Sequence, residues 1–191
     1  MTKKLNRNFY NQSTLKVAKE LLGKYLVVRK NGKLLSGKIV ETEAYIGYKD
    51  PASHAYRGMT PRNMVMFGDP GYAYVYFTYG MHHCLNLVTE KKGYPAAVLI
   101  RALEPTGGID SMKKRRKRKD LTDLASGPAK LCQALGVDLE LNGTDLCSDI
   151  LFVEDRGEAI EKIGYSSRIG IMEENQRKWR FFIRNNEFVS R

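Results

Sequence analysis

The chain has 191 residues, enough for one well-buried domain or a small two-lobed one. Its 32 Lys and Arg against 21 Asp and Glu leave a formal charge of +11, which favours an acidic polymer or an anionic surface as partner over a generally basic protein. Three cysteines without a C-x-x-C pair argue against a disulfide framework, and no apolar run predicts a membrane span or a signal peptide.

In chain order, the pattern predicts short helices and strands that are separated by turns rich in glycine and proline. The expected helices cover residues 14–22, 61–67 and 128–135. The expected strands cover residues 25–29, 34–45, 72–78, 83–89, 96–103, 150–153 and 180–184, with a tight hairpin turn at Asn31-Gly32. Short links favour antiparallel pairing, and no linker divides the chain. We therefore predict a single α+β domain over residues 1–191, built on a curved, largely antiparallel sheet with flanking helices.

Seven consecutive basic residues, Lys113 to Lys119, form the strongest local concentration of charge. Such a run predicts a solvated, mobile loop, which we place at residues 113–120. Contact with phosphate groups and simple exposure to solvent are both open.

Two carboxylates near the end of the second expected strand are candidates for proton transfer. Glu41 and Glu43 lie two residues apart and share one strand face, so their spacing does not separate them. Glu43 stands next to a loop, where it could take a proton from water or be a plain surface residue. Arg101 ends an apolar strand and could be a buried ion-pair partner or could steady a carboxylate and its water.

Tyrosines are concentrated in the stretch that follows. Tyr72, Tyr74 and Tyr76 share one strand face, which is typical of a core but also of a platform on which a base stacks. Gly80 predicts a sharp turn that presents Tyr79 as a wedge. A positive surface, aromatic faces and one reactive group together are what an enzyme needs to act on a base taken out of the DNA stack.

The histidines give little indication of a metal. His54 lies in the loop after Glu43, where it could bond a base edge. Of His82, His83 and Cys84, only the first and last share a strand face, and no zinc motif accompanies them. We therefore expect no metal site, and the missing H-x-E and C-x-x-C pattern argues against a zinc deaminase.

Six segments, in order along the chain, resemble motifs of the alkyladenine (3-methyladenine) DNA glycosylases. They are Ile39-Val40-Glu41-Thr42-Glu43-Ala44-Tyr45, Thr60-Pro61-Arg62-Asn63, Tyr74-Val75-Tyr76, Tyr79-Gly80-Met81, Arg101-Ala102-Leu103-Glu104-Pro105 and the stretch from Ser126 to Leu135. The resemblance covers about residues 8–190. It implies a monofunctional enzyme that flips damaged purines out of duplex DNA and hydrolyses the N-glycosidic bond, leaving an abasic site and starting base excision repair. The substrates would be 3-methyladenine, 7-methylguanine, hypoxanthine and ethenoadenine, with no cofactor.

The same resemblance implies roles for particular residues. Glu43 would be the general base and Arg101 would help to hold the attacking water. The base pocket would comprise Tyr45, His54, Tyr76, Asn86 and Leu99, with Asn86 crowding the exocyclic amine of guanine. Tyr79 and Met81 would enter the duplex from a protruding turn. We add candidate contacts to the DNA backbone: Lys113, Lys114, Arg115, Arg116 and Lys130.

Some properties stay open at this level. His82, Ala97 and Tyr48 depart from the mammalian pattern and leave the substrate range undefined. We expect a monomer, in the cytoplasm with the nucleoid if the source is bacterial and in the nucleus if it is eukaryotic. Two other functions compete: a nucleic-acid-binding module, since the family fold resembles the accessory domain of methionyl-tRNA formyltransferases, and a basic ribosome-associated protein. Glu43 in an aromatic setting favours the enzyme, because a binding module has no need of it.

Overall fold

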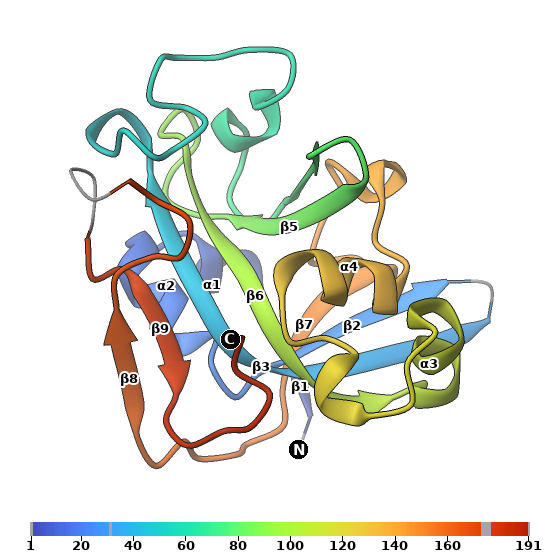
Figure 1. The fold of residues 1–191 in the computed structure, drawn as a ribbon. Coiled ribbons are helices and arrows are strands. Elements are labelled where there is room, and N and C mark those ends of the chain that lie inside the picture. Colours follow the sequence, from blue (N-terminus) through green and yellow to red (C-terminus); the bar gives the residue numbers. More distant parts are fainter. Residues whose placement is uncertain (1, 31, 173–176, 191) are drawn as a thin grey trace.

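The computed structural model describes residues 2–30, 32–172 and 177–190, and within these ranges nine strands form one twisted, open sheet (Figure 1). The main path runs β1-β7-β2-β3-β6-β5-β4, and β9 joins it by pairing with β3 and with β8. Every pairing between these strands is antiparallel. The predicted α+β class with a largely antiparallel sheet is confirmed.

The strands differ widely in length. They are β1 Lys3–Lys4, β2 Tyr25–Lys30, β3 Lys33–Ile46, β4 Ala73–Thr78, β5 His82–Val88, β6 Ala96–Gly107, β7 Leu151–Asp155, β8 Ile163–Ser166 and β9 Arg180–Ile183. The predicted tight turn at Asn31-Gly32 includes Asn31, which lies outside the described residues.

Helices cover the sheet in two groups. The α-helices are α1 Arg7–Tyr10, α2 Thr14–Glu20, α3 Ile109–Arg116 and α4 Pro128–Leu135, and the 3-10 helices are η1 Gly47–Lys49, η2 Met64–Phe67, η3 Leu121–Asp123 and η4 Leu139–Leu141. α2 packs on β3 and β6, while α4 packs on β5 and β6 and carries α3 against it (Figure 1). No helix among the described residues is long and apolar enough to cross a membrane.

β3 is the central strand, and its odd-numbered and even-numbered residues have different environments. The Thr42 hydroxyl donates to the Ala18 carbonyl of α2, 2.8 Å away, so the even face of this part of β3 meets α2. Alternation along a strand turns Glu41 and Glu43 to the other face. The β3–β6 pairing shifts register around Glu41, and Arg101 is the extra residue on β6 between the pairs Glu41↔Ala102 and Thr42↔Ile100. Such a bulge re-aims a side chain, and here it directs Arg101 toward both carboxylates.

The predicted mobile loop at residues 113–120 is wrong for its first half. Lys113 to Arg116 belong to α3, and Lys117 ends the helix in the left-handed conformation. The helix forms because Met112 is buried and Ile109 packs on the core. In the sequence these two apolar residues are followed directly by the basic run, so they give no clear helical pattern. The expected helix at 61–67 is shortened to the 3-10 turn η2, since a turn built on Asn63 precedes it.

Candidate active site

Four strands bring site residues into one row across the sheet. Glu43 on β3 pairs with Leu99 on β6, Leu99 pairs with Asn86 on β5, and Asn86 pairs with Tyr74 on β4. Directly opposite residues in antiparallel strands point to the same face. Segments up to 56 positions apart in the chain therefore present the side chains of Glu43, Leu99, Asn86 and Tyr74 side by side.

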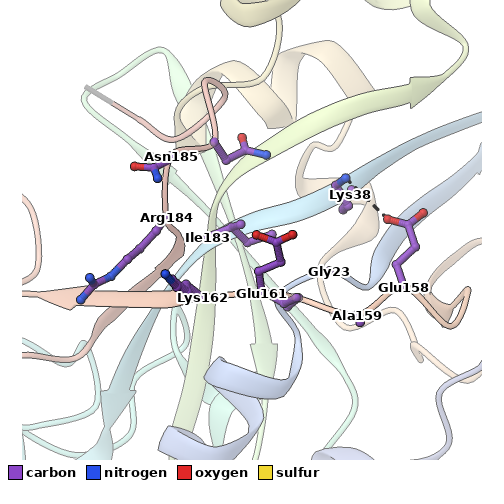
Figure 2. A pocket seen from close by; sticks show the side chains of 11 residues that line it. Gly23, Lys38, Glu158, Ala159, Glu161, Lys162, Ile183, Arg184 and Asn185 are labelled. Carbon is purple, nitrogen blue, oxygen red and sulfur yellow. Dashed lines mark ion pairs between the residues drawn. The ribbon is translucent and has the colours of Figure 1, made fainter.

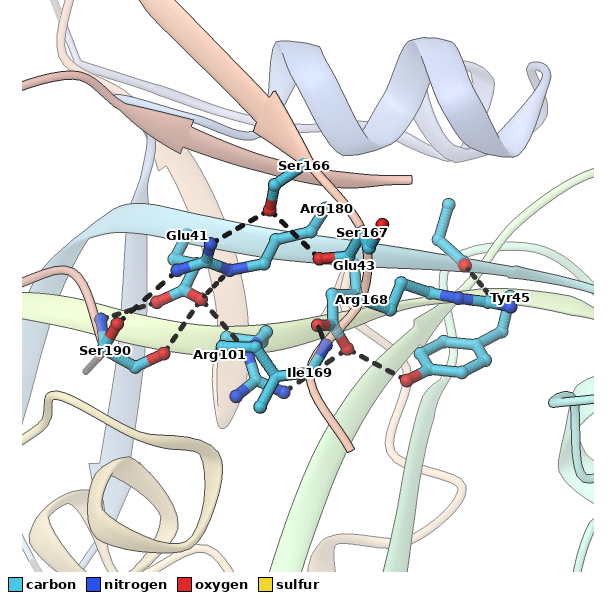
Figure 3. Close-up of polar contacts among 11 residues, drawn as sticks. Glu41, Glu43, Tyr45, Arg101, Ser166, Ser167, Arg168, Ile169, Arg180 and Ser190 are labelled. Atoms are coloured by element: carbon cyan, nitrogen blue, oxygen red, sulfur yellow. Dashed lines mark hydrogen bonds and ion pairs between the residues drawn. The ribbon is translucent and has the colours of Figure 1, made fainter. Parts of the chain in front are cut away.

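The two carboxylates have different partners, as Figure 3 shows. Glu41 accepts four hydrogen bonds: Oε1 from Arg101 Nε (3.0 Å), Arg180 Nε (2.6 Å) and Ser190 Oγ (2.8 Å), and Oε2 from the Ser190 N–H (2.7 Å). Three of these bonds end on Oε1 and one on Oε2, and two of the donors are guanidinium groups. Glu41 thus lies in a structural network of charged and polar protein groups.

Glu43 accepts three hydrogen bonds from described residues. Oε1 accepts from the Ile169 N–H (2.8 Å), and Oε2 from the Tyr45 hydroxyl (2.8 Å) and Arg101 Nη1 (3.3 Å). The side chain is fully buried, and burial raises the pKa of the Glu43 carboxyl against the opposing effect of Arg101. A raised pKa makes the carboxylate a stronger base, and one lone-pair site lacks a described donor.

A cavity of about 260 Å³ lies beside this carboxylate. All five residues that the resemblance assigns to the base-binding pocket line this cavity: Tyr45, His54, Tyr76, Asn86 and Leu99. Arg101 also lines it. Glu43 is not itself a lining residue, but three lining residues, Tyr45, Arg101 and Ile169, donate hydrogen bonds to its carboxylate. The cavity is slightly smaller than the ~300–1,000 Å³ range of small-molecule pockets.

Aromatic rings form one wall of the cavity. The rings of Tyr74 and Tyr76 lie 5.4 Å apart, and the His54 ring stands edge-on to Tyr76 at 4.5 Å. His54 Nδ1 and the Tyr74 hydroxyl are 2.9 Å apart. Surrounding protein atoms and then the charge of Arg62 lower the pKa of His54, which favours a neutral imidazole with one donor and one acceptor nitrogen.

A guanidinium already lies over each of two pocket tyrosines. Arg168 lies 4.6 Å from the Tyr45 ring centre, and Arg62 lies 5.1 Å from that of Tyr76. Arg62 is exposed and has no carboxylate within ion-pair distance among the described residues, whereas the charge of Arg168 is paired. These rings therefore stack against protein cations as well as facing the cavity.

Asn86 both lines the cavity and supports the sheet. Its Nδ2 donates to the Tyr74 carbonyl oxygen at 3.1 Å, and its side chain is almost fully buried. Ala97 is buried in the small apolar cluster around Met66 and Tyr74, while His82 and Tyr48 are exposed. The three departures from the mammalian pattern thus lie outside the lining of the cavity.

The turn between β4 and β5 protrudes with two large apolar side chains. Thr78 pairs with His82, so Tyr79, Gly80 and Met81 form the tip. Tyr79 is 88% exposed and Met81 is 70% exposed, and Tyr79 also borders the cavity. Tyr79 has a φ of 51° and Gly80 a φ of 67°, so both residues of the turn are in the left-handed conformation, which glycine adopts readily and tyrosine rarely.

The proposed backbone contacts divide into two groups. Arg115 Nη1 donates to the Ala134 carbonyl (3.1 Å) and Arg116 Nε to the Leu124 carbonyl (3.1 Å), so both fix α3 to its neighbours. Lys130 lies 3.4 Å from Ser126 Oγ. Lys113 and Lys114 make no ion pair within the described part of the chain and are the freer candidates.

Sequence reasoning missed residues that the tertiary structure brings to the site. Ile169 comes from a coil segment 126 positions after Glu43, and Arg180 and Ser190 come from the C-terminal region. For Tyr74 the sequence offers one signal, its place in the tyrosine stripe. The coil segment has no periodicity or motif that could have indicated its role.

A second cavity, of about 270 Å³, lies between the segment 158–162 and the end of β9 (Figure 2). It is lined by Lys38, Lys162 and Arg184 but also by Glu158 and Glu161. Lys38 pairs with Glu104 (3.0 Å) and Glu158 (3.5 Å). The cavity shares no lining residue with the one beside Glu43, and its charges are mixed. Among the described residues, no group of three or more His, Cys, Asp or Glu is placed to hold a metal ion.

A buried carboxylate beside an aromatic cavity, next to an exposed apolar tip on a basic protein, is the arrangement expected of an enzyme that acts on a base taken out of the DNA stack. Residues 8–187 match the model of the methylpurine-DNA glycosylase family. The chain belongs to this family. It is therefore a DNA glycosylase, a hydrolase of N-glycosyl bonds that acts in DNA repair.

Curated relatives agree over nearly the whole length. A protein of Carboxydothermus hydrogenoformans is 54% identical over 98% of each chain. One of Methanocella arvoryzae is 53% identical over 98% of this chain and 96% of its own. One of Clostridium perfringens (strain SM101) is 49% identical over 98% of this chain and 99% of its own. Each carries the name "Putative 3-methyladenine DNA glycosylase".

Proposed function

We propose that this protein flips alkylated or deaminated purines out of duplex DNA and hydrolyses their N-glycosidic bond with a water activated by Glu43. The substrates are 3-methyladenine, 7-methylguanine, hypoxanthine and ethenoadenine. The single observation that carries the proposal is the unequal environment of the carboxylates. Glu41 is bonded by two guanidinium groups and by Ser190, and of these donors only Arg101 lines the cavity. All three donors to Glu43 line the cavity, and its pKa is raised.

In this mechanism the water sits at the cavity wall near Arg101 and Ile169. Its oxygen attacks the anomeric carbon, its proton passes to Glu43, and the bonding pair of the glycosidic bond leaves with the base. 3-Methyladenine and 7-methylguanine carry a positive charge in the nucleotide and leave as neutral bases, so activation of the water suffices for them. Hypoxanthine and ethenoadenine are neutral in the nucleotide, so each takes up one proton from solvent water as it leaves. No lysine Schiff base forms, which makes the enzyme monofunctional.

Tyr79 fills the space that the flipped nucleotide vacates. A large exposed side chain on a left-handed turn can replace lost stacking, which otherwise costs a few kcal/mol. The rings of Tyr45, Tyr76 and His54 then hold the extruded base. Because Arg62 and Arg168 already lie over two of these rings, shape and hydrogen bonding contribute to selection beside cation–π attraction.

The test uses duplexes that each carry one defined lesion. The protein is incubated with each duplex in the presence of EDTA, and abasic sites are revealed by alkaline cleavage. Abasic sites should form at hypoxanthine and at 3-methyladenine, at rates unchanged by the chelator. Binding to lesion duplexes with no abasic sites would favour the binding module instead, and reversible loss of activity in EDTA would contradict the cofactor-free mechanism.

A further inference from the structure

Beside the active site lies a fully buried ion pair that the mechanism above does not use. Arg168 and Asp50 meet through two parallel contacts, Nη1 to Oδ2 at 2.6 Å and Nη2 to Oδ1 at 2.7 Å, and both side chains are 0% exposed. Arg168 Nη1 also donates to the Ala44 carbonyl at 2.9 Å. A bidentate fork fixes the plane of the guanidinium as well as its position.

Arg168 contacts or adjoins three residues that surround Glu43: Ala44, Tyr45 and Ile169 (Figure 3). Ala44 follows Glu43 on β3. Ile169 follows Arg168 and donates its N–H to Glu43 Oε1 at 2.8 Å. The Tyr45 ring lies 4.6 Å below the guanidinium, while its hydroxyl donates to Glu43 Oε2 at 2.8 Å. One buried cation thus touches three parts of the carboxylate's surroundings.

We propose that Arg168 and Asp50 are positioning residues, which hold the Ile169 N–H and the Tyr45 ring in place against Glu43. The inference rests on the proposed role of Glu43 as the base. Buried ion pairs contribute little net stability compared with apolar residues of the same volume, so a structural role alone accounts poorly for this one. The groups that contact a catalytic carboxylate must be held to within about 0.5 Å of their working positions, and this requires further residues that fix those groups.

The consequence concerns the protonation of Glu43. The Ile169 N–H and the Tyr45 hydroxyl stabilise the charged carboxylate and so lower its pKa, in opposition to burial. The other charged or titratable groups around Glu43 are Glu41 on β3, Arg101 on β6, Arg180 on β9 and Cys84 on β5. None of them changes when Arg168 is replaced. A loosened Ile169 or Tyr45 should therefore raise the pKa of Glu43 and move the acid limb of the rate profile to higher pH.

Arg168→Lys is the informative variant, because lysine keeps the charge and loses the fork and the flat face. Arg7→Lys is a control for the same change in a similar but partly exposed setting. Arg7 likewise pairs with an aspartate (Asp145, 2.7 Å), donates to a backbone carbonyl (Pro70, 2.8 Å) and lies over a tyrosine ring (Tyr72, 4.9 Å), but these residues lie outside the lining of the active-site cavity. Single-turnover excision of hypoxanthine is measured against pH for the parent and both variants, with melting temperatures.

In R168K the acid limb of the rate profile should shift to higher pH by about one unit. At pH values below the limb, the rate should then be roughly tenfold lower than that of the parent. At higher pH the rate should approach the parent's plateau. R7K should follow the parent profile. Superimposable profiles for R168K and R7K would overturn the proposal. If R168K does not fold, Asp50→Glu takes its place, because it keeps both charges and displaces the fork, and failure of both to fold would assign the pair to the fold and not to the site. An inactive parent would instead refute the proposed function itself.

Discussion

Glu41 and Glu43 share one guanidinium: Arg101 donates through Nε to Glu41 Oε1 at 3.0 Å and through Nη1 to Glu43 Oε2 at 3.3 Å. Only Glu41 has a second guanidinium among the described residues, that of Arg180 at 2.6 Å. The positive charge is therefore divided unequally between two carboxylates on one strand face. This division distinguishes the structural carboxylate from the one with basic character.

Arg101 should govern the pH dependence of excision. Burial raises the pKa of Glu43 and the charge of Arg101 opposes that rise. The active form is the carboxylate, so the rate should increase as pH rises through the pKa and then level off. In Arg101→Gln the acid limb should move to higher pH, by about one unit or more, since an opposite charge at this distance lowers a carboxyl pKa by ~1–3 units.

The measurement is the single-turnover rate from acid to neutral pH, for which Arg101→Lys is the control. Lysine retains the charge, so its limb should lie closer to that of the parent. An R101Q limb at the parent position would show that Arg101 does not set the ionisation of Glu43.

Tyr79→Ala should weaken base flipping more than it weakens general affinity for DNA. The side chain is 88% exposed at the tip of the turn, so its removal leaves the core intact. An ethenoadenine lesion changes fluorescence when it leaves the stack and reports flipping directly. Tyr165→Ala, which removes an exposed tyrosine on β8 outside this turn, is the control and should leave flipping unchanged. The wedge role is refuted if the Y79A flipping equilibrium equals that of the parent.

Asn86→Ser should raise excision of guanine-type bases relative to hypoxanthine. Guanine differs from hypoxanthine only by its exocyclic amine, and a side chain that crowds this amine discriminates by repulsion. Asn86 lines the cavity but also bonds the Tyr74 carbonyl, so a sheet-supporting role competes. Single-turnover rates on guanine and hypoxanthine duplexes separate the two. A parallel fall of both rates would assign Asn86 to support of the sheet.

Replacement of Lys113 and Lys114 by Gln should reduce affinity for damaged and undamaged duplexes alike. Phosphate contacts carry no base information, so the specificity ratio should hold. The slope of log K against log salt should become shallower by about 0.9 for each phosphate that the variant no longer neutralises. Arg115→Gln and Arg116→Gln should instead lower the melting temperature, because these side chains bond neighbouring carbonyls. An unchanged slope in the lysine variant would exclude Lys113 and Lys114 from contact with phosphate groups.

Local patterns in the sequence were sufficient for most strands and for α4, because alternation and the glycine and proline stops are local signals. They were insufficient for α3, whose two apolar contacts, Ile109 and Met112, precede a run of charges. The choice between Glu41 and Glu43 also could not come from spacing. It depends on Arg180 and Ser190, which reach Glu41 only after the C-terminal region folds back onto β3.

The most direct test of the proposed mechanism is single-turnover excision of hypoxanthine by Glu43→Gln and Glu41→Gln at one temperature, below the melting point of both. E43Q should bind the lesion but lose at least about a hundredfold in rate, as expected for a general base. E41Q should retain most of the rate but melt lower, because a broken buried ion pair costs ~3–5 kcal/mol. An E43Q rate within about tenfold of the parent, a barrier change under ~1.4 kcal/mol, would contradict the assignment of Glu43 as the base.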